Sequence, residues 1–177
     1  DQRRGRAGRT EPGICWRLWN EGQTAALQPY STPEILEADL SQLVLDLAAV
    51  GVRDPATLAF LDPPPKPAWN EAIDLLGGLE AIDESGLITP EGKALARLPL
   101  PPRLAHMIHR AADFGVARMA ADIAAILTEQ GLGGDTTDLA DRLARLRADR
   151  SQRAVDARAM AAKWARLVSE RGSADML

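Results

Sequence analysis

The spacing of hydrophobic residues predicts a mostly helical chain. Between residues 31 and 50, apolar side chains recur every three or four positions, which is the helical period. Ser31 and Glu34 fit a capping box, Pro33 suits a first turn, and Gly51 suits a helix end. The same period predicts a short helix that starts at Pro55, and helices over about 67–79, 90–97, 102–114 and 116–130.

Two regions have the signals of β structure. Residues 13–19 alternate with a period of two, which predicts a short strand whose sheet partners lie outside this sequence. Segments 79–82 and 87–89 flank a polar turn and predict a hairpin. Because this hairpin follows three predicted helices, the element order is that of a winged helix. The expected fold is therefore mainly α: a winged-helix domain with a small β-hairpin, followed by a helical bundle.

The last third of the chain is basic and helical in pattern. Residues 138–148 and about 152–170 predict two helices, or one long helix with a break near Ser151. The glycine-rich segment 131–134 precedes them. It resembles a plain helix connector more than a phosphate-binding loop, because no lysine follows it.

Composition narrows the function classes. The 177 residues are 46% hydrophobic and 26% charged, typical of a globular protein, and no apolar run approaches the ~20 residues of a membrane span. One cysteine, Cys15, and two histidines, His106 and His109, predict neither a disulfide nor a metal site. A reducing, cytoplasmic location follows. The net charge of −4 argues against a general nucleic-acid coat, although basic residues gather in segments 1–9 and 142–171.

The N-terminal residues Gln2 to Thr10 read Q-R-R-G-R-A-G-R-T. They resemble the Q-R-x-G-R-A-G-R signature that ends the second RecA-like domain of DEAH/DExH-type superfamily-2 RNA helicases. Segments 33–36, 61–64 and 87–100 are similar to the downstream region of that family, and residues 102–107 look most like the bacterial HrpB type. The resemblance covers residues 1 to about 130.

The resemblance implies three parts. Residues 1–30 would be a remnant of the second RecA-like motor domain, residues 31–92 a winged-helix domain, and residues 93–177 a helical ratchet, or helicase-associated, domain. The chain would be the C-terminal accessory region of an ATP-dependent helicase whose other motor domains are missing here. ATP and Mg²⁺ would act in the full-length parent, and no cofactor is expected in this fragment.

The chemistry of the signature follows from its residue types. ATP hydrolysis builds negative charge on the transferred phosphoryl group, and an arginine placed against that charge accelerates the reaction by ~10³–10⁵. By resemblance, Arg6 and Arg9 are the catalytic arginines and, with Gln2 and Gly5, the ATP-facing residues. Arg6 and Arg9 are three positions apart and would share a face on a helical turn. Glycine at position 5 would let the backbone approach a nucleotide.

The sequence lacks other parts of an ATPase. No G-x-x-x-x-G-K-[ST] phosphate loop and no Asp-Glu-x-His box occurs in it. The chain also starts inside a dense motif, which predicts a piece of a longer protein. We therefore expect the parent to be an ATP-dependent RNA helicase and this fragment alone to be inactive.

Single-stranded RNA, bound without sequence preference, is the expected partner. Arg103, His106 and Arg110 share a helix on which they would face an RNA backbone, or form only a solvated helix face. The competing function is a non-catalytic winged-helix module that binds nucleic acid or protein. The helix over 67–79 bears on this alternative, because it carries Glu71 and Asp74 but no arginine, which disfavours DNA readout.

Overall fold

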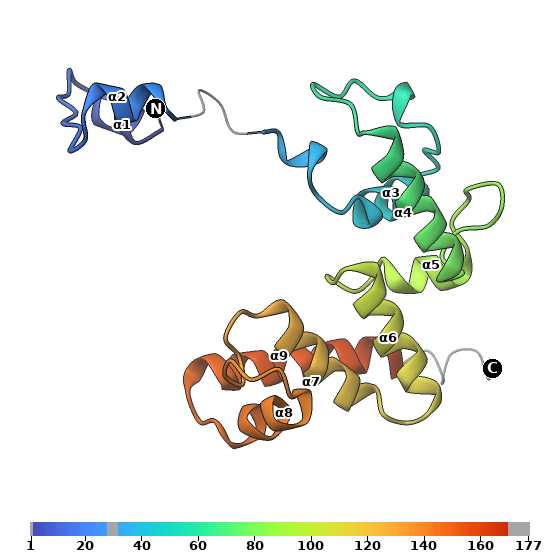
Figure 1. The fold of residues 1–177 in the computed structure, drawn as a ribbon. Helices are drawn as coiled ribbons and strands as arrows, with labels where there is room; N and C mark the ends of the chain where they lie inside the picture. The colour runs from blue at the N-terminus through green and yellow to red at the C-terminus, as the bar shows by residue number, and fades with distance from the viewer. Residues whose placement is uncertain (1, 28–31, 170–177) are drawn as a thin grey trace. The chain divides into compact units, whose positions relative to one another are not determined.

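The computed structural model describes residues 2–27 and 32–169, and the chain divides into two compact units, residues 1–33 and 34–177 (Figure 1). Each unit is considered by itself. In the described residues of both units, all regular elements are α-helices or short 3₁₀ turns, and no strand is formed. The predicted mainly α class is confirmed, and the predicted β elements are not.

The first unit holds two short helices, α1 (Gln2–Ala7) and α2 (Glu21–Ala25). A capping box starts α2: the Asn20 side chain accepts from the Gln23 backbone N–H at 2.8 Å, and the Gln23 side chain accepts from the Asn20 backbone N–H at 3.2 Å. The chain between them passes so close to α1 that a Cβ on Gly13 would lie 1.9 Å from the Ala7 carbonyl oxygen. Residues 13–19 do not form a strand here, where the described residues of the unit offer no second strand to pair with them, and their predicted pairing in a sheet outside this sequence stays a prediction.

The second unit begins with a helix that is shorter than predicted. A 3₁₀ turn, η1 (Glu34–Leu36), precedes α3 (Ser41–Ala49). The backbone between them leaves the helical path because the Asp39 carboxylate accepts the Ser41 N–H at 2.8 Å and starts the helix there. The predicted capping residue Ser31 lies outside the described residues, and the short helix expected from Pro55 is a single 3₁₀ turn, η2 (Pro55–Thr57).

The part of the second unit that the sequence predicts as a winged helix, called the winged-helix part below, is built on α3, α4 (Lys66–Gly78) and α5 (Pro90–Leu95). Helices α3 and α4 pack together through buried side chains that include Leu45 and Leu76. Trp69 is buried in this core, as the apolar face of its helix predicts. Thr89 fixes the start of α5, since its hydroxyl accepts from Gly92 N–H at 3.0 Å and donates to the Glu80 carbonyl at 2.6 Å.

The predicted hairpin is reduced to one isolated antiparallel bridge between Ile82 and Ile88. The Asp83 carboxylate accepts the backbone N–H groups of Ser85 and Leu87, at 2.8 and 2.9 Å. These bonds shape the segment as a side-chain-closed turn. Because α5 starts at Pro90, directly after the bridge, no residues remain to extend a ladder.

The rest of the second unit is a helical bundle of α6 (Pro102–Asp113), α7 (Ala117–Thr128), α8 (Leu139–Ala148) and α9 (Gln152–Ser169). Helices α8 and α9 are separate, which settles the alternative of one long helix. The break is fixed by Asp149, whose carboxylate accepts the Ser151 N–H at 2.7 Å. Helix α7 packs most extensively on α9, and α6 packs on both (Figure 1).

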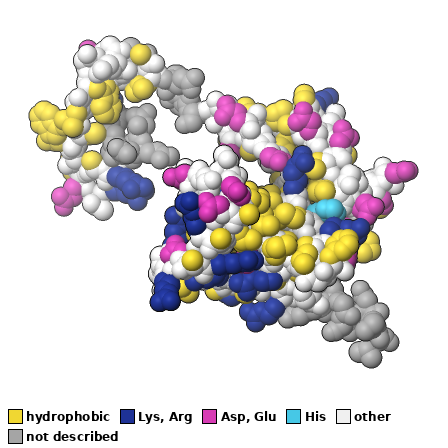
Figure 2. Space-filling model, turned by 60° about the horizontal axis from the view of Figure 1, so that its bottom comes forward, with side chains coloured by type: hydrophobic (Ala, Val, Ile, Leu, Met, Phe, Trp, Pro, Cys, Tyr) yellow, Lys and Arg dark blue, Asp and Glu magenta, His cyan; other side chains and the backbone are white. Residues whose placement is uncertain are grey.

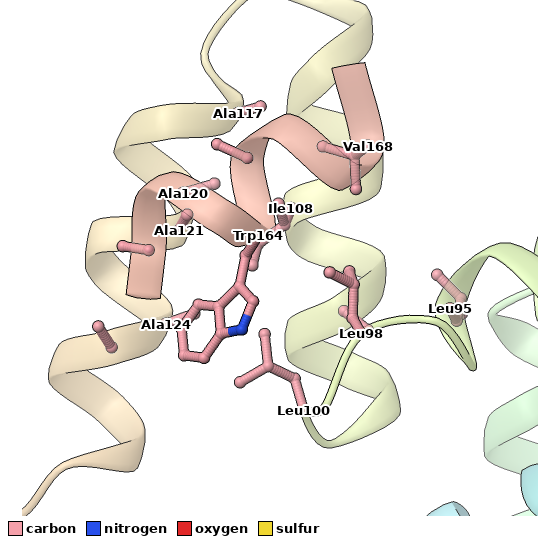
Figure 3. Close-up of a cluster of buried hydrophobic side chains, with 14 of the residues drawn as sticks. Leu95, Leu98, Leu100, Ile108, Ala117, Ala120, Ala121, Ala124, Trp164 and Val168 are labelled. Atoms are coloured by element: carbon pink, nitrogen blue, oxygen red, sulfur yellow. The ribbon is translucent and has the colours of Figure 1, made fainter. Parts of the chain in front are cut away.

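Small side chains allow this close packing. Figure 3 shows Trp164 of α9 directed into the space between α6 and α7, with Leu100 beside it. Trp164 is 4% exposed. Buried alanines on α7 and α9 let the two backbones approach each other closely around it; they are Ala117, Ala120, Ala121, Ala124, Ala125, Ala154, Ala157, Ala161 and Ala165.

Candidate nucleotide motif and nucleic-acid interface

The arginine-rich motif lies on and just after α1. Gln2 is the first residue of α1, and its side chain lies outside the described part of the structure. Gly5 and Arg6 are exposed on the helix. Because α1 ends at Ala7, Arg9 lies in the bend that follows, so Arg6 and Arg9 do not share a helical face as expected. Gln2, four positions before Arg6, is in register with it on α1. Both candidate arginines are exposed cations.

An apolar stripe follows the motif. Ile14, Trp16 and Leu18 are alternate residues of a segment without regular secondary structure, and they are 80%, 83% and 95% exposed. Folded chains rarely leave such a row of large apolar side chains in water. The period-two pattern is typical of a strand with one buried face, and this unit alone does not bury the three side chains.

Arg103, the first predicted RNA contact, lies among carboxylates. It lines a cavity of about 310 Å³ whose wall also includes Glu37, Asp39 and Glu71. Hydrogen bonds from Ser41 hold the pKa of the Asp39 carboxyl below its ordinary value, and the positive charge of Arg103 contributes to that lowering. Three nearby acids make this position a poor one for a phosphate group.

The other two predicted RNA contacts differ in their surroundings. His106 is half-buried on α6, and Arg110 is exposed, with its guanidinium 3.7 Å from the Asp113 carboxylate. An exposed pair at that distance contributes little energy. Arg110 therefore remains accessible to a ligand, whereas the expected three-residue basic face is interrupted at Arg103.

Sequence reasoning missed a contact that joins α5 to α6. The Nδ1 atom of His109 lies 2.9 Å from Oε1 of Glu91, and both side chains are largely buried. The approach does not have the geometry of a hydrogen bond, and neither atom has another partner among the described residues. No spacing rule reveals this pair, because its members lie on different helices.

Several arginines of the basic C-terminal segment have structural partners. Arg142 donates to the carbonyl oxygens of Leu132 and Ile126, at 2.9 and 3.0 Å, and so caps the end of α7. Arg158 similarly donates to the carbonyls of Leu146 and Asp149, at the end of α8. Such bonds satisfy carbonyls that have no partner inside a helix.

Other basic side chains of this segment remain available to a ligand. Figure 2 shows Lys and Arg side chains gathered along the lower edge of the larger unit. Among the described residues, four cations of α8, α9 and their connection are exposed and have neither an ion pair nor a side-chain hydrogen bond: Arg147, Arg150, Lys163 and Arg166. The sequence pattern located this basic segment. It did not distinguish the arginines that bind carbonyl oxygens from the cations that have no partner in the described part of the chain, because only the fold shows which carbonyls each arginine can reach.

Comparisons with known proteins agree with this architecture. The pattern of the winged-helix part of the helicase-associated domain (HA2) matches residues 72–100. Over 130 residues, the chain is 41% identical to the mouse protein described as probable ATP-dependent RNA helicase DHX34. Over 128 residues, it is 38% identical to the fission yeast pre-mRNA-splicing factor ATP-dependent RNA helicase prp22. The chain belongs to the DEAH/DExH helicase family.

The structural match is to a bacterial member of this helicase family. The Escherichia coli DExH-box NTPase HrpB superposes with a TM-score of 0.67 and 34% sequence identity, over 93% of this chain and 20% of that one. The curated match to mouse DHX34 covers 73% of this chain and 11% of that protein. This chain therefore corresponds to a limited part of its relatives, the part that includes the helicase-associated domain.

Within the described residues, no helix is long and apolar enough to cross a membrane. The predicted cytoplasmic location stays a prediction.

Proposed function

We propose that this chain is the accessory region of an ATP-dependent RNA helicase, joined to the last motif of its motor. Arg6 and Arg9 complete the ATP site against motor domains supplied by the rest of the parent, and the bundle forms part of the RNA path. The observation that carries this proposal is the exposed motif followed directly by an exposed apolar stripe. That combination is expected of a segment that is buried in a larger sheet domain.

The residues present fit one side of a nucleotide site. Arg6 and Arg9 are exposed guanidinium groups, which suit phosphate oxygens, and Gly5 leaves the backbone without a side chain beside them. ATP would supply the transferred phosphoryl group there. In the described residues, no group of acidic or His/Cys side chains is arranged to hold Mg²⁺. Magnesium would therefore be held by the motor domains of the parent.

The charge distribution supports RNA contact through the bundle rather than through the winged helix. The exposed face of α4 includes Glu71 and Asp74, which repel phosphate, and this weighs against a winged-helix DNA reader. Four exposed cations that have no partner among the described residues gather on α8, α9 and their connection, whereas helices α3, α4 and α5 of the winged-helix part carry only Lys66 and Lys93 of this kind. Arg110 of α6 is also exposed, although its guanidinium lies 3.7 Å from a carboxylate of the same helix. Backbone contacts of this kind bind RNA without reading its sequence.

Steady-state kinetics of the full-length parent tests the ATP role. Arg6→Ala is expected to lower the ATP turnover rate by ~10³-fold or more, because the charge that develops on the phosphoryl group loses its partner. ATP affinity, measured by equilibrium binding, should change little. Arg17→Ala provides a matched control, since it removes an exposed arginine of the same unit from outside the motif. Equal turnover in wild type and Arg6→Ala would reject the assignment.

A further inference from the structure

A groove at the outer end of the bundle lies apart from the residues assigned to ATP or RNA, except for Arg166, which borders it. It has a volume of about 430 Å³ and lies between the start of α7, the preceding turn, and the last turns of α9. Its lining consists of small side chains and two arginines: Ala112, Gly115, Ala117, Arg118, Ala162, Ala165, Arg166 and Ser169. The lining contains no acidic residue.

Two guanidinium groups line the groove, one already paired with a carboxylate and one without a partner among the described residues. Arg118 is held in place, because its Nε donates to the Asp122 carboxylate at 3.1 Å and its Nη2 donates to the Arg158 carbonyl at 3.3 Å. Its Nη1 has no hydrogen bond among the described residues. Arg166 is exposed and likewise has no partner among them. Because the guanidinium of Arg118 is already positioned, it loses little side-chain entropy when it binds a carboxylate.

An exposed aromatic residue directly precedes one of the lining residues in the chain. Phe114 is 80% exposed at the end of α6, next to the lining residue Gly115. The turn that holds it is well defined: Gly115 has a φ of 70°, and the Val116 N–H donates to the Ala111 carbonyl at 2.9 Å. Aromatic and arginine side chains beside a shallow apolar floor are typical of protein–protein contact sites.

We propose that this groove binds an acidic, aliphatic segment of another polypeptide. The carboxylates of the segment would pair with Arg118 and Arg166, its small apolar side chains would cover the alanine floor, and Phe114 would pack over its edge. The floor decides in favour of a peptide over RNA, because alanine side chains offer neither a stacking surface nor donors for sugar and phosphate groups. This inference does not depend on the proposed role of Arg6 and Arg9.

Fluorescence anisotropy with the 177-residue chain tests the proposal. The probe is a short labelled peptide of Glu, Leu and Ala, and its counterpart carries Lys at each Glu position. We expect binding of the acidic peptide and none of the basic one. Arg166→Glu should weaken the affinity for the acidic peptide by about tenfold, which is the effect of losing one charge-assisted contact. Phe114→Ser should also weaken it, without loss of helical circular dichroism, because Phe114 is exposed.

Lys163→Glu is the matched control, because it reverses an exposed charge on the same helix at a position that does not line the groove. It should leave the affinity unchanged. Equal losses in Arg166→Glu and Lys163→Glu would show general charge attraction and overturn the proposal. So would displacement of the acidic peptide by single-stranded RNA that binds wild type and fails to bind Arg166→Glu, or the absence of any binding of the acidic peptide.

Discussion

The two units of the chain use similar residues in opposite ways. In residues 5–27, the described side chains are exposed apart from Thr24, and this includes two tryptophans and three large aliphatic residues. Residues 34–169 contain a continuous core in which Trp69 and Trp164 are buried. Hydrophobic residues alone do not make a core; they need a partner surface inside the same folding unit. Hydrophobic side chains are visible on the surface of the smaller unit in Figure 2.

Replacing one tryptophan in each unit gives the largest expected difference in the free energy of unfolding. Trp164→Ala removes a buried side chain from between α6, α7 and α9, and is expected to lower the free energy of unfolding by about 3–5 kcal/mol. Trp16→Ala removes a side chain that is 83% exposed, and should change it by no more than about 0.5 kcal/mol. Urea denaturation followed by circular dichroism measures both values. Equal losses would mean that the first unit also has a core.

Arginines of the basic segment provide the next comparison. Arg142→Ala is expected to cost about 1–3 kcal/mol of unfolding free energy, because the Leu132 and Ile126 carbonyls lose their donor. Arg147→Ala is its matched control: it removes the same charge from the same helix at an exposed position without a partner among the described residues. It should leave stability unchanged within about 0.5 kcal/mol. Urea denaturation measures both values. The division into structural and available arginines is wrong if both variants lose the same free energy of unfolding.

How far the sequence predicted the fold depended on what fixed each element. Helices α4, α6, α7 and α9 followed from apolar spacing, because each buries one face against the same unit. The start of α3 did not, because the Asp39 side chain decides it locally. The strand over 13–19 does not form here, since a strand requires a neighbouring strand and the described residues of its unit contain none; its pairing with a sheet outside this sequence stays a prediction.

Only some features of the candidate site could likewise be predicted from the sequence. The motif of Arg6 and Arg9 was visible as residue types at fixed spacing, and its ATP-facing role stays a prediction. The surroundings of Arg103 were not visible, because Glu37, Asp39 and Glu71 come from segments far from it in sequence. Spacing along a helix shows which residues share a face, but not which charges from other elements lie opposite that face.

RNA affinity should separate the available cations from Arg103. The chain is expected to bind single-stranded RNA with a Kd in the ~10⁻⁴–10⁻⁶ M range. In a fluorescence titration over several salt concentrations, the double variant Arg147→Gln/Arg150→Gln should lower the slope of log affinity against log salt by about 0.7 per lost contact. Arg103→Gln should leave this slope unchanged. The assignment fails if Arg103→Gln lowers the slope and the double variant does not.

The smallest expected effect concerns two helix starts that use the same device, one in the winged-helix part and one in the bundle. Asp39 accepts the Ser41 N–H before α3, and Asp149 accepts the Ser151 N–H before α9. Hydrogen bonds from these serines lower the pKa of each carboxyl below its ordinary value. A lowered pKa in the folded state stabilises the fold above the unfolded pKa, and that contribution is lost as the pH falls through the folded pKa.

The loss should therefore occur below about pH 4, the ordinary range of an aspartate. Asp39→Asn and Asp149→Asn keep a side-chain oxygen acceptor but remove the titration. Each variant is expected to melt slightly below wild type at pH 7, and the difference should shrink as the pH falls from 5 to 3. Thermal melts across this range measure it, with Asp46→Asn, an exposed aspartate inside α3, as the control. If the gap between wild type and either variant stays constant over this range, the charge of that aspartate does not stabilise its helix start.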